Sequence, residues 1–285
     1  MRSKHWALLL LCCMLTGCGR AELPEPTLSP EPAPIVTEAP VLKREFQPVD
    51  GLVPVGEICE FLGFELELSG DTSALIEGRS LEYLPEDGVI CFDGRWLYAP
   101  EGFNLREGEL WLESEAAEKI LNLRQQGGTL IAHKEEAKLL SGGEDYYDLN
   151  YPMDMLYWLP QIIHAEAYQQ PMAGLIGVGN VVMNRMESDK FPDSVTNVIF
   201  DREHVIQFEP VENGSIKAQP DERAHIAACL CLEGYNTVGD SLFFVNPAYG
   251  SYWFDTELEL TYVIGEHNFY RYKEPSQSAS LTALP

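Results

Sequence analysis

The second half of the chain begins with apolar positions that repeat at helical spacing. Met155, Leu159 and Ile162 recur at intervals of four and three residues, which is typical of one apolar face of a helix. The next position on that face is Glu166, so a carboxylate stands where the pattern calls for an apolar side chain. Pro160 interrupts the pattern, and the alternative is a helix that begins near Pro160 with the proline in its first turn. Under both interpretations Glu166 lies beside apolar side chains.

The position of Glu166 points to acid catalysis. Burial among apolar side chains raises the pKa of a carboxyl group because it disfavours the charged form. A glutamate that keeps its proton near neutral pH is able to act as a general acid. We therefore predict that Glu166 is catalytic. The alternative is a solvated surface glutamate, because most glutamates in proteins are exposed.

A predominantly helical pattern continues over residues 151–273, which we interpret as one module. After a turn, Gly174, Gly177 and Gly179 fall in a second helix, where they lower helix propensity and are expected to permit close helix packing. Asp221 is the expected N-cap of a further helix. Short strands are expected at residues 242–246 and 261–264.

Residues 49–123 have a different pattern, with one helix, several short strands and a last helix. The first helix ends at Gly63, and a strictly alternating strand follows it. Asp93-Gly94 is a hairpin signal, and Ser114 is the expected N-cap of the last helix. Strands are expected at residues 64–68, 73–76, 80–84, 89–92 and 96–99. The prediction is an α+β chain of two domains, in which residues 124–150 form a connector with one short helical piece.

The amino terminus has the features of an export signal. Residues 1–17 combine Arg2 and Lys4 with an apolar core that is too short to span a bilayer. The core ends in Leu15-Thr16-Gly17-Cys18, which resembles the lipobox of bacterial lipoproteins and implies lipid attachment at Cys18. The alternatives are an ordinary signal peptide or an uncleaved anchor. Residues 18–48 are rich in proline and are expected to be a tether, and residues 274–285 a tail.

Charge and cysteine usage exclude several classes of function. The 285 residues include 19 Lys and Arg and 45 Asp and Glu, and a net charge of −26 argues against binding nucleic acid or anionic lipid electrostatically. Cys229 and Cys231 point in different directions on a helix and are not expected to pair, whereas pairing of Cys59 with Cys91 stays open. Because no Cys/His cluster has zinc spacing, we expect neither a metal nor another cofactor.

The second module contains a series of short motifs in a fixed order. They are His164-Ala165-Glu166-Ala167, Gly177 with Val181-Val182-Met183-Asn184-Arg185, Phe191-Pro192, Gln207-Phe208, Pro210-Val211 with Asn213-Gly214, Asn246-Pro247 and Gly265-Glu266-His267-Asn268-Phe269-Tyr270. In these motifs the module resembles the SleB-type cell wall hydrolase domain of spore cortex-lytic enzymes. The chain departs from the family at Gln170, where a second glutamate is usual, and it has no peptidoglycan-binding repeat. The first module resembles the copper amine oxidase N-terminal-like domain, a resemblance that implies no copper here.

The resemblance implies a mainly α, lysozyme-like catalytic domain. It implies a lytic transglycosylase that cuts the bond between N-acetylmuramic acid and N-acetylglucosamine in peptidoglycan glycan strands. Glu166 would be the single general acid and base, and the products would carry 1,6-anhydro-muramyl ends. The expected location is the outer face of a bacterial membrane, through a lipid on Cys18, in the cell envelope or the spore. The sequence does not decide between cortex and vegetative wall, and it names no protein activator.

Several residues near these motifs are candidates for substrate binding. Amide side chains suit sugar hydroxyl and acetamido groups, large aromatic rings suit sugar faces, and a histidine is able to orient a polar group. The alternatives are loop stabilisation for the amides, core packing for the aromatic residues and turn capping for the histidine. The candidates are Gln207, Phe208, Asn246, Tyr252, Trp253 and His267.

Two other activities and one inactive role remain open at this point. A muramidase-type hydrolase needs a second carboxylate about 5–5.5 Å or 6.5–9.5 Å from the first, and Glu209 and Glu212 are the candidates. An amidase needs zinc ligands or a Cys/His pair, and neither is evident. The third alternative is a catalytically silent wall-binding lipoprotein.

Overall fold

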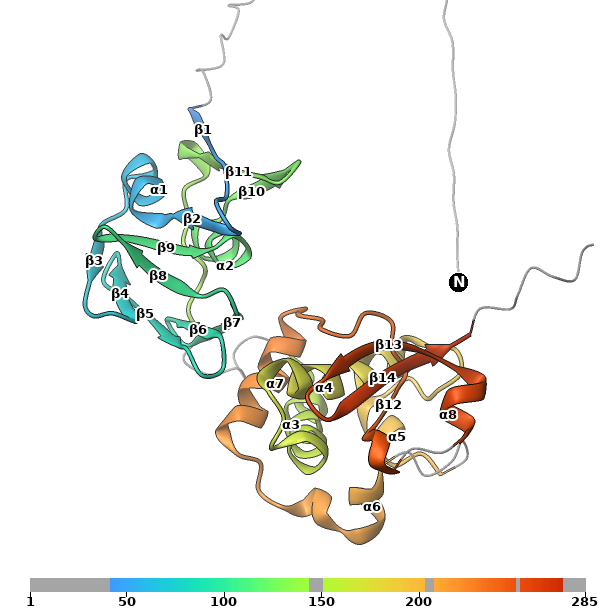
Figure 1. The fold of residues 1–285 in the computed structure, drawn as a ribbon. Coiled ribbons are helices and arrows are strands. Elements are labelled where there is room, and N and C mark those ends of the chain that lie inside the picture. Colours follow the sequence, from blue (N-terminus) through green and yellow to red (C-terminus); the bar gives the residue numbers. More distant parts are fainter. Residues whose placement is uncertain (1–41, 144–150, 203–207, 250–251, 274–285) are drawn as a thin grey trace, which may run out of the picture. The chain divides into compact units, whose positions relative to one another are not determined.

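The computed structural model describes residues 42–143, 151–202, 208–249 and 252–273 (Figure 1). The chain divides between Pro40 and Val41, and all described residues fall in the unit Val41–Pro285. The predicted signal peptide, Cys18 and the predicted tether up to residue 41 lie outside the described residues. Within these four ranges, the helices are all too short or too polar to cross a membrane.

The first part of this unit contains three antiparallel sheets and two helices. The largest sheet has the order β3-β4-β5-β6-β7, and the others have the orders β2-β9-β8 and β1-β11-β10. The helices are α1 (Val55–Leu62) and α2 (Ser114–Leu121). The strands are β1 (Lys43–Phe46), β2 (Leu52–Pro54), β3 (Leu66–Leu68), β4 (Ser73–Ile76), β5 (Arg79–Leu84), β6 (Val89–Phe92), β7 (Arg95–Tyr98), β8 (Phe103–Arg106), β9 (Glu109–Glu113), β10 (Arg124–Gln126) and β11 (Thr129–His133).

Most elements predicted for this part are confirmed. The hairpin at Asp93-Gly94 joins β6 to β7, with positive φ angles of 49° and 84° at the two turn residues. The prediction for Ser114 is wrong, because Glu113 holds the N-cap position of α2. The Ser114 hydroxyl instead donates to the carbonyl oxygen of Gly51 at 2.7 Å, which ties the start of α2 to the turn before β2.

Three strands lie in segments that were predicted to be linkers. β1 falls within the predicted tether, and β10 and β11 fall within the predicted connector. The turn between β10 and β11 is Gly127-Gly128, with φ angles of 59° and 84°. Paired glycines with positive φ are a hairpin signal that the sequence analysis missed. The short helical piece expected in the connector is the 3-10 helix at Lys134–Glu136.

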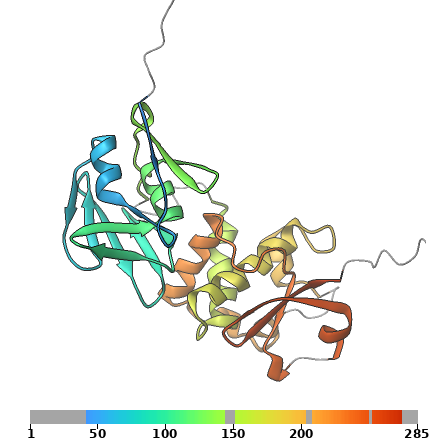
Figure 2. The ribbon, with the colours of Figure 1, turned by 45° about the horizontal axis from the view of Figure 1, so that its top comes forward.

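The second part is built on three helices that pack together, α3, α4 and α7 (Figures 1 and 2). A small antiparallel sheet of order β12-β14-β13 adjoins them through contacts between α4 and β12. The helices are α3 (Met153–Ala167), α4 (Met172–Glu187), α5 (Val195–Ile199), α6 (Glu209–Asn213), α7 (Glu222–Leu232) and α8 (Tyr252–Glu257), with 3-10 helices at Ser215–Lys217 and Pro247–Tyr249. The strands are β12 (Phe243–Val245), β13 (Leu258–Ile264) and β14 (His267–Tyr272).

Helix α3 begins well before Pro160, at Met153, and contains the proline. The alternative in which the helix starts near Pro160 is therefore wrong. Met155, Leu159 and Ile162 are buried, as the spacing predicted. Burial of this apolar face stabilises the helix and outweighs the backbone hydrogen bond that proline removes.

The close helix packing expected from the glycines is confirmed at Gly179, whereas Gly177 packs closely against the loop after α7 and strand β14. A Cβ atom on Gly177 would lie 2.8 Å from Cγ1 of Val238, and one on Gly179 would lie 2.6 Å from Sγ of Cys231. The predicted N-cap is also confirmed, because the Asp221 side chain accepts a hydrogen bond from the Ala224 amide at 2.9 Å.

The mixed α+β class is confirmed by these elements. The domain boundaries proposed within residues 41–285 and the lysozyme-like architecture of the second part remain predictions. Among the described residues, Cys59, Cys91, Cys229 and Cys231 form no disulfide bond. The absence of a bond between Cys229 and Cys231 agrees with their spacing on α7.

We expect Gly179→Ala to lower the free energy of unfolding by about 1–3 kcal/mol, because the added methyl group overpacks the contact with Cys231. Chemical denaturation of the full chain measures this change. The matched control is His225→Ala, at an exposed position of α7, which is expected to stay within about 0.5 kcal/mol of the wild type. Equal stability of the two variants would contradict the close packing of α4 against α7.

Candidate active site

Glu166 lies in the last turn of α3, with a side chain that is partly buried. Ile162 and Ile163, one turn earlier, are fully buried, and Ala167 beside it is also buried. The helical periodicity of α3 thus places the carboxyl group at the edge of the apolar core, as the sequence predicted.

The environment of Glu166 raises the pKa of its carboxyl group from 4.5 to about 7. Burial is the largest cause, because a buried carboxylate loses the stabilisation that water gives its charge. The negative charge of Glu209 raises the pKa further, whereas the positive charge of Arg185 lowers it. Near neutral pH both the acid and its conjugate base are therefore populated, which suits a group that gives up a proton and takes one back.

Arg185 is the fixed positive charge of this region. Its side chain is only 2% exposed, and the guanidinium lies 5.1, 5.0 and 5.5 Å from the ring centroids of Phe191, Phe208 and Phe243. We call these three residues the aromatic cage. The Arg185 Nε atom donates to the carbonyl oxygen of Leu242 at 2.7 Å. Cation–π contacts of this kind are strongest where the cation is removed from water.

Burial lowers the pKa of Arg185 from 12.5 to about 10, and its electrostatic interactions with Tyr272, Asp201 and Glu166 oppose that shift. The guanidinium is therefore charged at neutral pH. Its charge stabilises the ionised form of Glu166 and keeps the pKa of that carboxyl from rising further. This role was not predicted from the sequence, although an arginine two residues after the apolar run Val181-Val182-Met183 was an available signal.

The turn that follows Glu166 is held by hydrogen bonds from two directions. Arg223 on α7 donates from Nη1 to the Tyr168 carbonyl oxygen at 3.2 Å and from Nη2 to the Gln170 carbonyl oxygen at 3.1 Å. The Gln170 side chain accepts a hydrogen bond from the Glu266 amide at 2.8 Å. Gln170 thus links the α3–α4 turn to the turn between β13 and β14. Gln170 therefore has a structural role in this chain.

Phe208 is not available to stack on a sugar. Its side chain is 1% exposed, and its ring contacts Arg185 and lies 6.2 Å from the ring of Phe244. The prediction that Phe208 binds substrate is therefore wrong. The Phe208 ring is enclosed by other side chains and stabilises the core. Its contribution to the site is indirect, through the aromatic cage.

Asn246 and Trp253 have different surroundings. The Asn246 side chain accepts from the Ala248 amide at 2.9 Å and donates to Oε2 of Glu266 at 3.3 Å, which matches loop stabilisation. Trp253 is 43% exposed and packs edge-on against Phe243 at 5.5 Å. Trp253 therefore has free surface for a sugar ring while it contacts the aromatic cage.

His267 is buried, with 7% of its surface exposed, between the rings of Phe244 and Phe269 at 5.3 and 6.2 Å. Burial lowers the pKa of its imidazole, and the charge of Glu266 opposes that shift. His267 is therefore neutral at physiological pH. Gln207 and Cys18 lie outside the described residues, and for Tyr252 the structure describes only the backbone.

No group of three or more His, Cys, Asp and Glu side chains in the described part of the chain is arranged to hold a metal ion.

Comparison with known proteins identifies the class of this region. Residues 169–270 match the family described as Cell Wall Hydrolase. Spore cortex-lytic enzymes from Halalkalibacterium halodurans and Bacillus subtilis are 35% and 34% identical to the chain over 89 residues, which is 31% of the chain and 26% and 28% of those enzymes. The spore cortex-lytic enzyme of Oceanobacillus iheyensis is 30% identical over 120 residues, or 42% of each protein.

A solved structure, the catalytic domain of the germination-specific lytic transglycosylase SleB from Bacillus anthracis, is 28% identical. The match covers 43% of this chain and 98% of that domain, with a TM-score of 0.39. The family match over residues 169–270 and the similarity to the curated relatives confirm the predicted resemblance to a cell wall hydrolase domain. The chain spans less than half the length of the curated relatives it matches. Glu166 lies three residues before the segment matched to the family, so its role rests on the geometry described above.

The raised pKa of Glu166 predicts a pH-dependent stability. Its pKa is higher in the folded chain than the 4.5 of an unperturbed glutamate, so the folded state binds this proton more tightly than the unfolded state. The corresponding stability is present below pH 4.5 and is lost as the pH rises to about 7. We expect Glu166→Gln, which mimics the protonated acid, to match the wild type at pH 4 and to be more stable at pH 8 by up to about 3 kcal/mol.

Denaturation of the full chain at the two pH values measures this difference. The matched control is Glu222→Gln, which removes an exposed carboxylate on α7 and is expected to show no such gain at pH 8. A Glu166→Gln variant with the same stability relative to wild type at both pH values would show that Glu166 is not held in a burying environment.

Proposed function

We propose that this chain cleaves peptidoglycan glycan strands as a lytic transglycosylase, with Glu166 as its single general acid and base. The observation that carries the proposal is the partly buried carboxyl group whose pKa of about 7 allows it to exist in both protonation states. The cell wall hydrolase match over residues 169–270 and the similarity to spore cortex-lytic enzymes support the choice of substrate.

The proposed reaction needs no water molecule. Glu166 donates its proton to the glycosidic oxygen as the bond from that oxygen to C1 of the muramic sugar breaks. The C6 hydroxyl oxygen of the same sugar then bonds to C1, and its proton returns to Glu166. The products are a free sugar hydroxyl at one end and a 1,6-anhydro ring at the other, and the enzyme is restored to its starting state.

The positive charge of Arg185 has a defined part in this cycle. It stabilises the Glu166 carboxylate in the interval between the two proton transfers, because opposite charges favour the ionised form. Burial favours the return of the proton. The two influences oppose each other and hold the pKa near neutrality, where proton donation and proton uptake are both accessible.

A second candidate function, a muramidase-type hydrolase, is favoured by one observation. Glu209 is the first residue of α6, is exposed, and lies near enough to raise the pKa of Glu166. In hydrolysis Glu209 would act as the second carboxylate that activates water or attacks the sugar. In the transglycosylase it only tunes Glu166.

We also propose that the protein is attached to the outer face of a bacterial membrane through a lipid on Cys18. The support is the run Leu15-Thr16-Gly17-Cys18 and the proline-rich residues that follow it. Labelling of the expressed full chain with a fatty-acid analogue tests this attachment. Incorporation of the fatty-acid analogue into the wild type and its loss in Cys18→Ala would support the lipid anchor. Equal incorporation into both proteins would contradict it.

The function is tested by mass spectrometry of the fragments that the full chain releases from purified vegetative peptidoglycan and from cortex peptidoglycan. The wild type is expected to release anhydro-muramyl fragments, and Glu166→Gln is expected to lower their release at least about 100-fold. Glu209→Gln is expected to keep the same products at a reduced rate in neutral buffer. The control Glu222→Gln is expected to match the wild type.

The other outcomes identify the alternatives. Reducing muramic ends that disappear in Glu209→Gln would show a hydrolase with two carboxylates. Binding to both substrates without any release of fragments would show a catalytically silent wall-binding protein. Full activity of Glu166→Gln would exclude both mechanisms that use this residue as the acid.

A further inference from the structure

A groove separate from Glu166 lies where the end of α4 meets strand β14 and the loop before β12. Its volume is about 320 Å³. The residues that line it come from three segments far apart in the sequence, and Glu166 is not among them. The lining residues are Asn184, Glu187, Ser188, Lys190, Asp240, Leu242, Arg271 and Tyr272.

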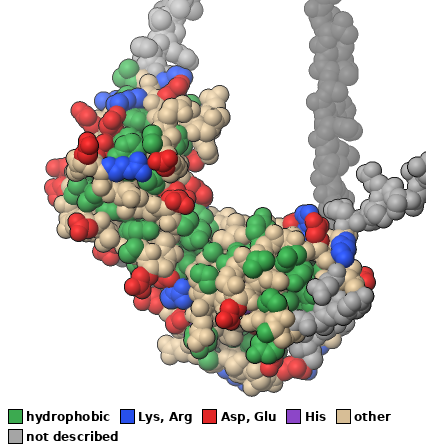
Figure 3. Space-filling model, viewed as in Figure 1, with side chains coloured by type: hydrophobic (Ala, Val, Ile, Leu, Met, Phe, Trp, Pro, Cys, Tyr) green, Lys and Arg blue, Asp and Glu red, His purple; other side chains and the backbone are tan. Residues whose placement is uncertain are grey.

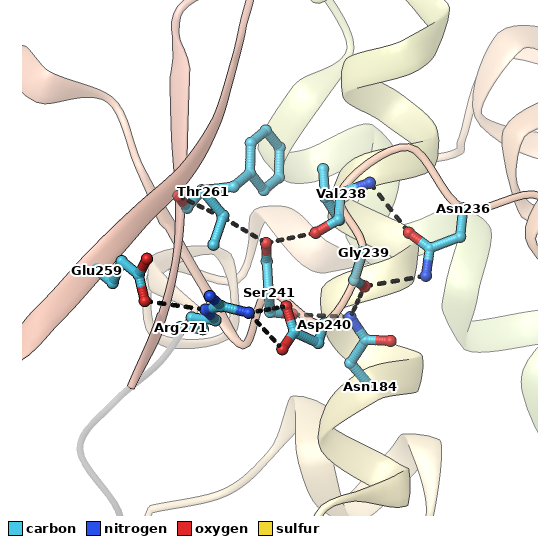
Figure 4. Close-up of polar contacts among 10 residues, drawn as sticks. Asn184, Asn236, Val238, Gly239, Asp240, Ser241, Glu259, Thr261 and Arg271 are labelled. Carbon is cyan, nitrogen blue, oxygen red and sulfur yellow. Dashed lines mark hydrogen bonds and ion pairs between the residues drawn. The ribbon is translucent and has the colours of Figure 1, made fainter. Parts of the chain in front are cut away.

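The loop that forms one side of the groove is fixed by hydrogen bonds (Figure 4). Asn184 on α4 donates to the carbonyl oxygens of Gly239 and Ser241 at 2.7 and 2.9 Å. The Ser241 hydroxyl donates to the Val238 carbonyl oxygen and lies 2.7 Å from the Thr261 hydroxyl. The groove is therefore preformed, and a ligand would not have to order this loop.

The charges of the groove fall into two groups. Arg271 is already paired, with Nη1 3.1 Å from Asp240 and Nε 3.1 Å from Glu259 (Figure 4). Glu187 and Lys190 are exposed, and among the described residues neither side chain has an ion-pair partner. One anion and one cation are thus available on the same short segment at the end of α4.

Tyr272 adds an aromatic surface beside the cation. The Lys190 ammonium group lies 4.0 Å from the centroid of the Tyr272 ring. On the face of the molecule drawn in Figure 3, acidic side chains outnumber lysine and arginine, as expected for a net charge of −26. Lys190 is therefore an uncommon point at which a carboxylate is attracted to a surface that otherwise repels it.

We propose that this groove binds the peptide stem of peptidoglycan, a short peptide with free carboxylates and, where it is not crosslinked, a free side-chain amine. A stem carboxylate pairs with Lys190, the stem amine pairs with Glu187, and the aliphatic part of the diamino acid lies on Tyr272. Both signs of charge on one rigid groove match a zwitterionic peptide better than a neutral glycan. The inference rests on the proposed function, because it names a second contact with the same polymer.

The groove also has a physical connection to the candidate active site. The Tyr272 ring packs edge-on against Phe243 at 5.1 Å, and Phe243 belongs to the aromatic cage around Arg185. A stem peptide held in the groove would therefore contact Tyr272, which packs against the aromatic cage around the positive charge of Arg185.

Calorimetric titration of the full chain with the free tetrapeptide stem, L-Ala-D-Glu-diaminopimelate-D-Ala, tests the proposal. We expect measurable binding by the wild type and a loss of affinity of at least about fivefold in Lys190→Glu, because the substitution turns an attraction into a repulsion. Glu187→Gln is expected to weaken binding less. The matched control is Lys138→Glu, an equal charge change at an exposed site outside the groove, which is expected to bind as the wild type does.

Failure of this proposal is distinguishable from failure of the proposed function. Titration requires no cleavage, so Glu166→Gln is expected to bind the tetrapeptide as tightly as the wild type. No binding at millimolar peptide, or the same loss in Lys138→Glu as in Lys190→Glu, would overturn the groove assignment. Thermal unfolding of each variant is measured beside the titration. If Lys190→Glu unfolds at the same temperature as the wild type, misfolding is excluded as the cause of lost binding.

Discussion

The site depends on the burial of Arg185 close to Glu166. Removing a guanidinium from water is costly, and the protein offsets that cost with three aromatic rings, a hydrogen bond to the Leu242 carbonyl oxygen and nearby negative charge. The same burial raises the pKa of Glu166, and the charge of Arg185 limits the rise. If Glu166 and Arg185 were more exposed to water, Glu166 would be ionised near neutral pH. If Glu166 were equally buried but had no Arg185 nearby, its carboxyl group would hold its proton too firmly to serve as a base.

Close packing of three helices is what permits this arrangement. At Gly177 and Gly179, helix α4 approaches its neighbours so closely that a Cβ atom would not fit. Arg185 lies on the same helix, and its side chain is buried in the core. Asn180, also buried, donates to the Tyr235 carbonyl oxygen and accepts from the Thr237 amide at 2.9 and 3.0 Å. Helix α4 is thus fixed to the loop after α7 by polar contacts and to α3 by shape.

The position of Glu166 could be predicted from the sequence because one helical period decides it. Its partners could not be predicted, because Phe191, Phe208 and Phe243 come from separate segments and meet only in the folded chain. Phe208 illustrates the limit: an aromatic residue in a polar loop pattern suits a sugar or a core equally well, and only its 1% exposure decides. The strands β10 and β11 were missed for a local reason, since a glycine-rich segment was interpreted as a linker although paired glycines also form hairpin turns.

The most direct test of this account is the ionisation of Glu166 itself. A carbon-13 NMR titration of the glutamate carboxyl groups of the full chain, compared with the same spectrum of Glu166→Gln, isolates the signal of this residue. The account predicts that the signal titrates with a pKa of about 7. A signal that titrates at the ordinary value of 4.5 would show that Glu166 is not held as a neutral-pH acid, and it would contradict the proposed mechanism at its first step.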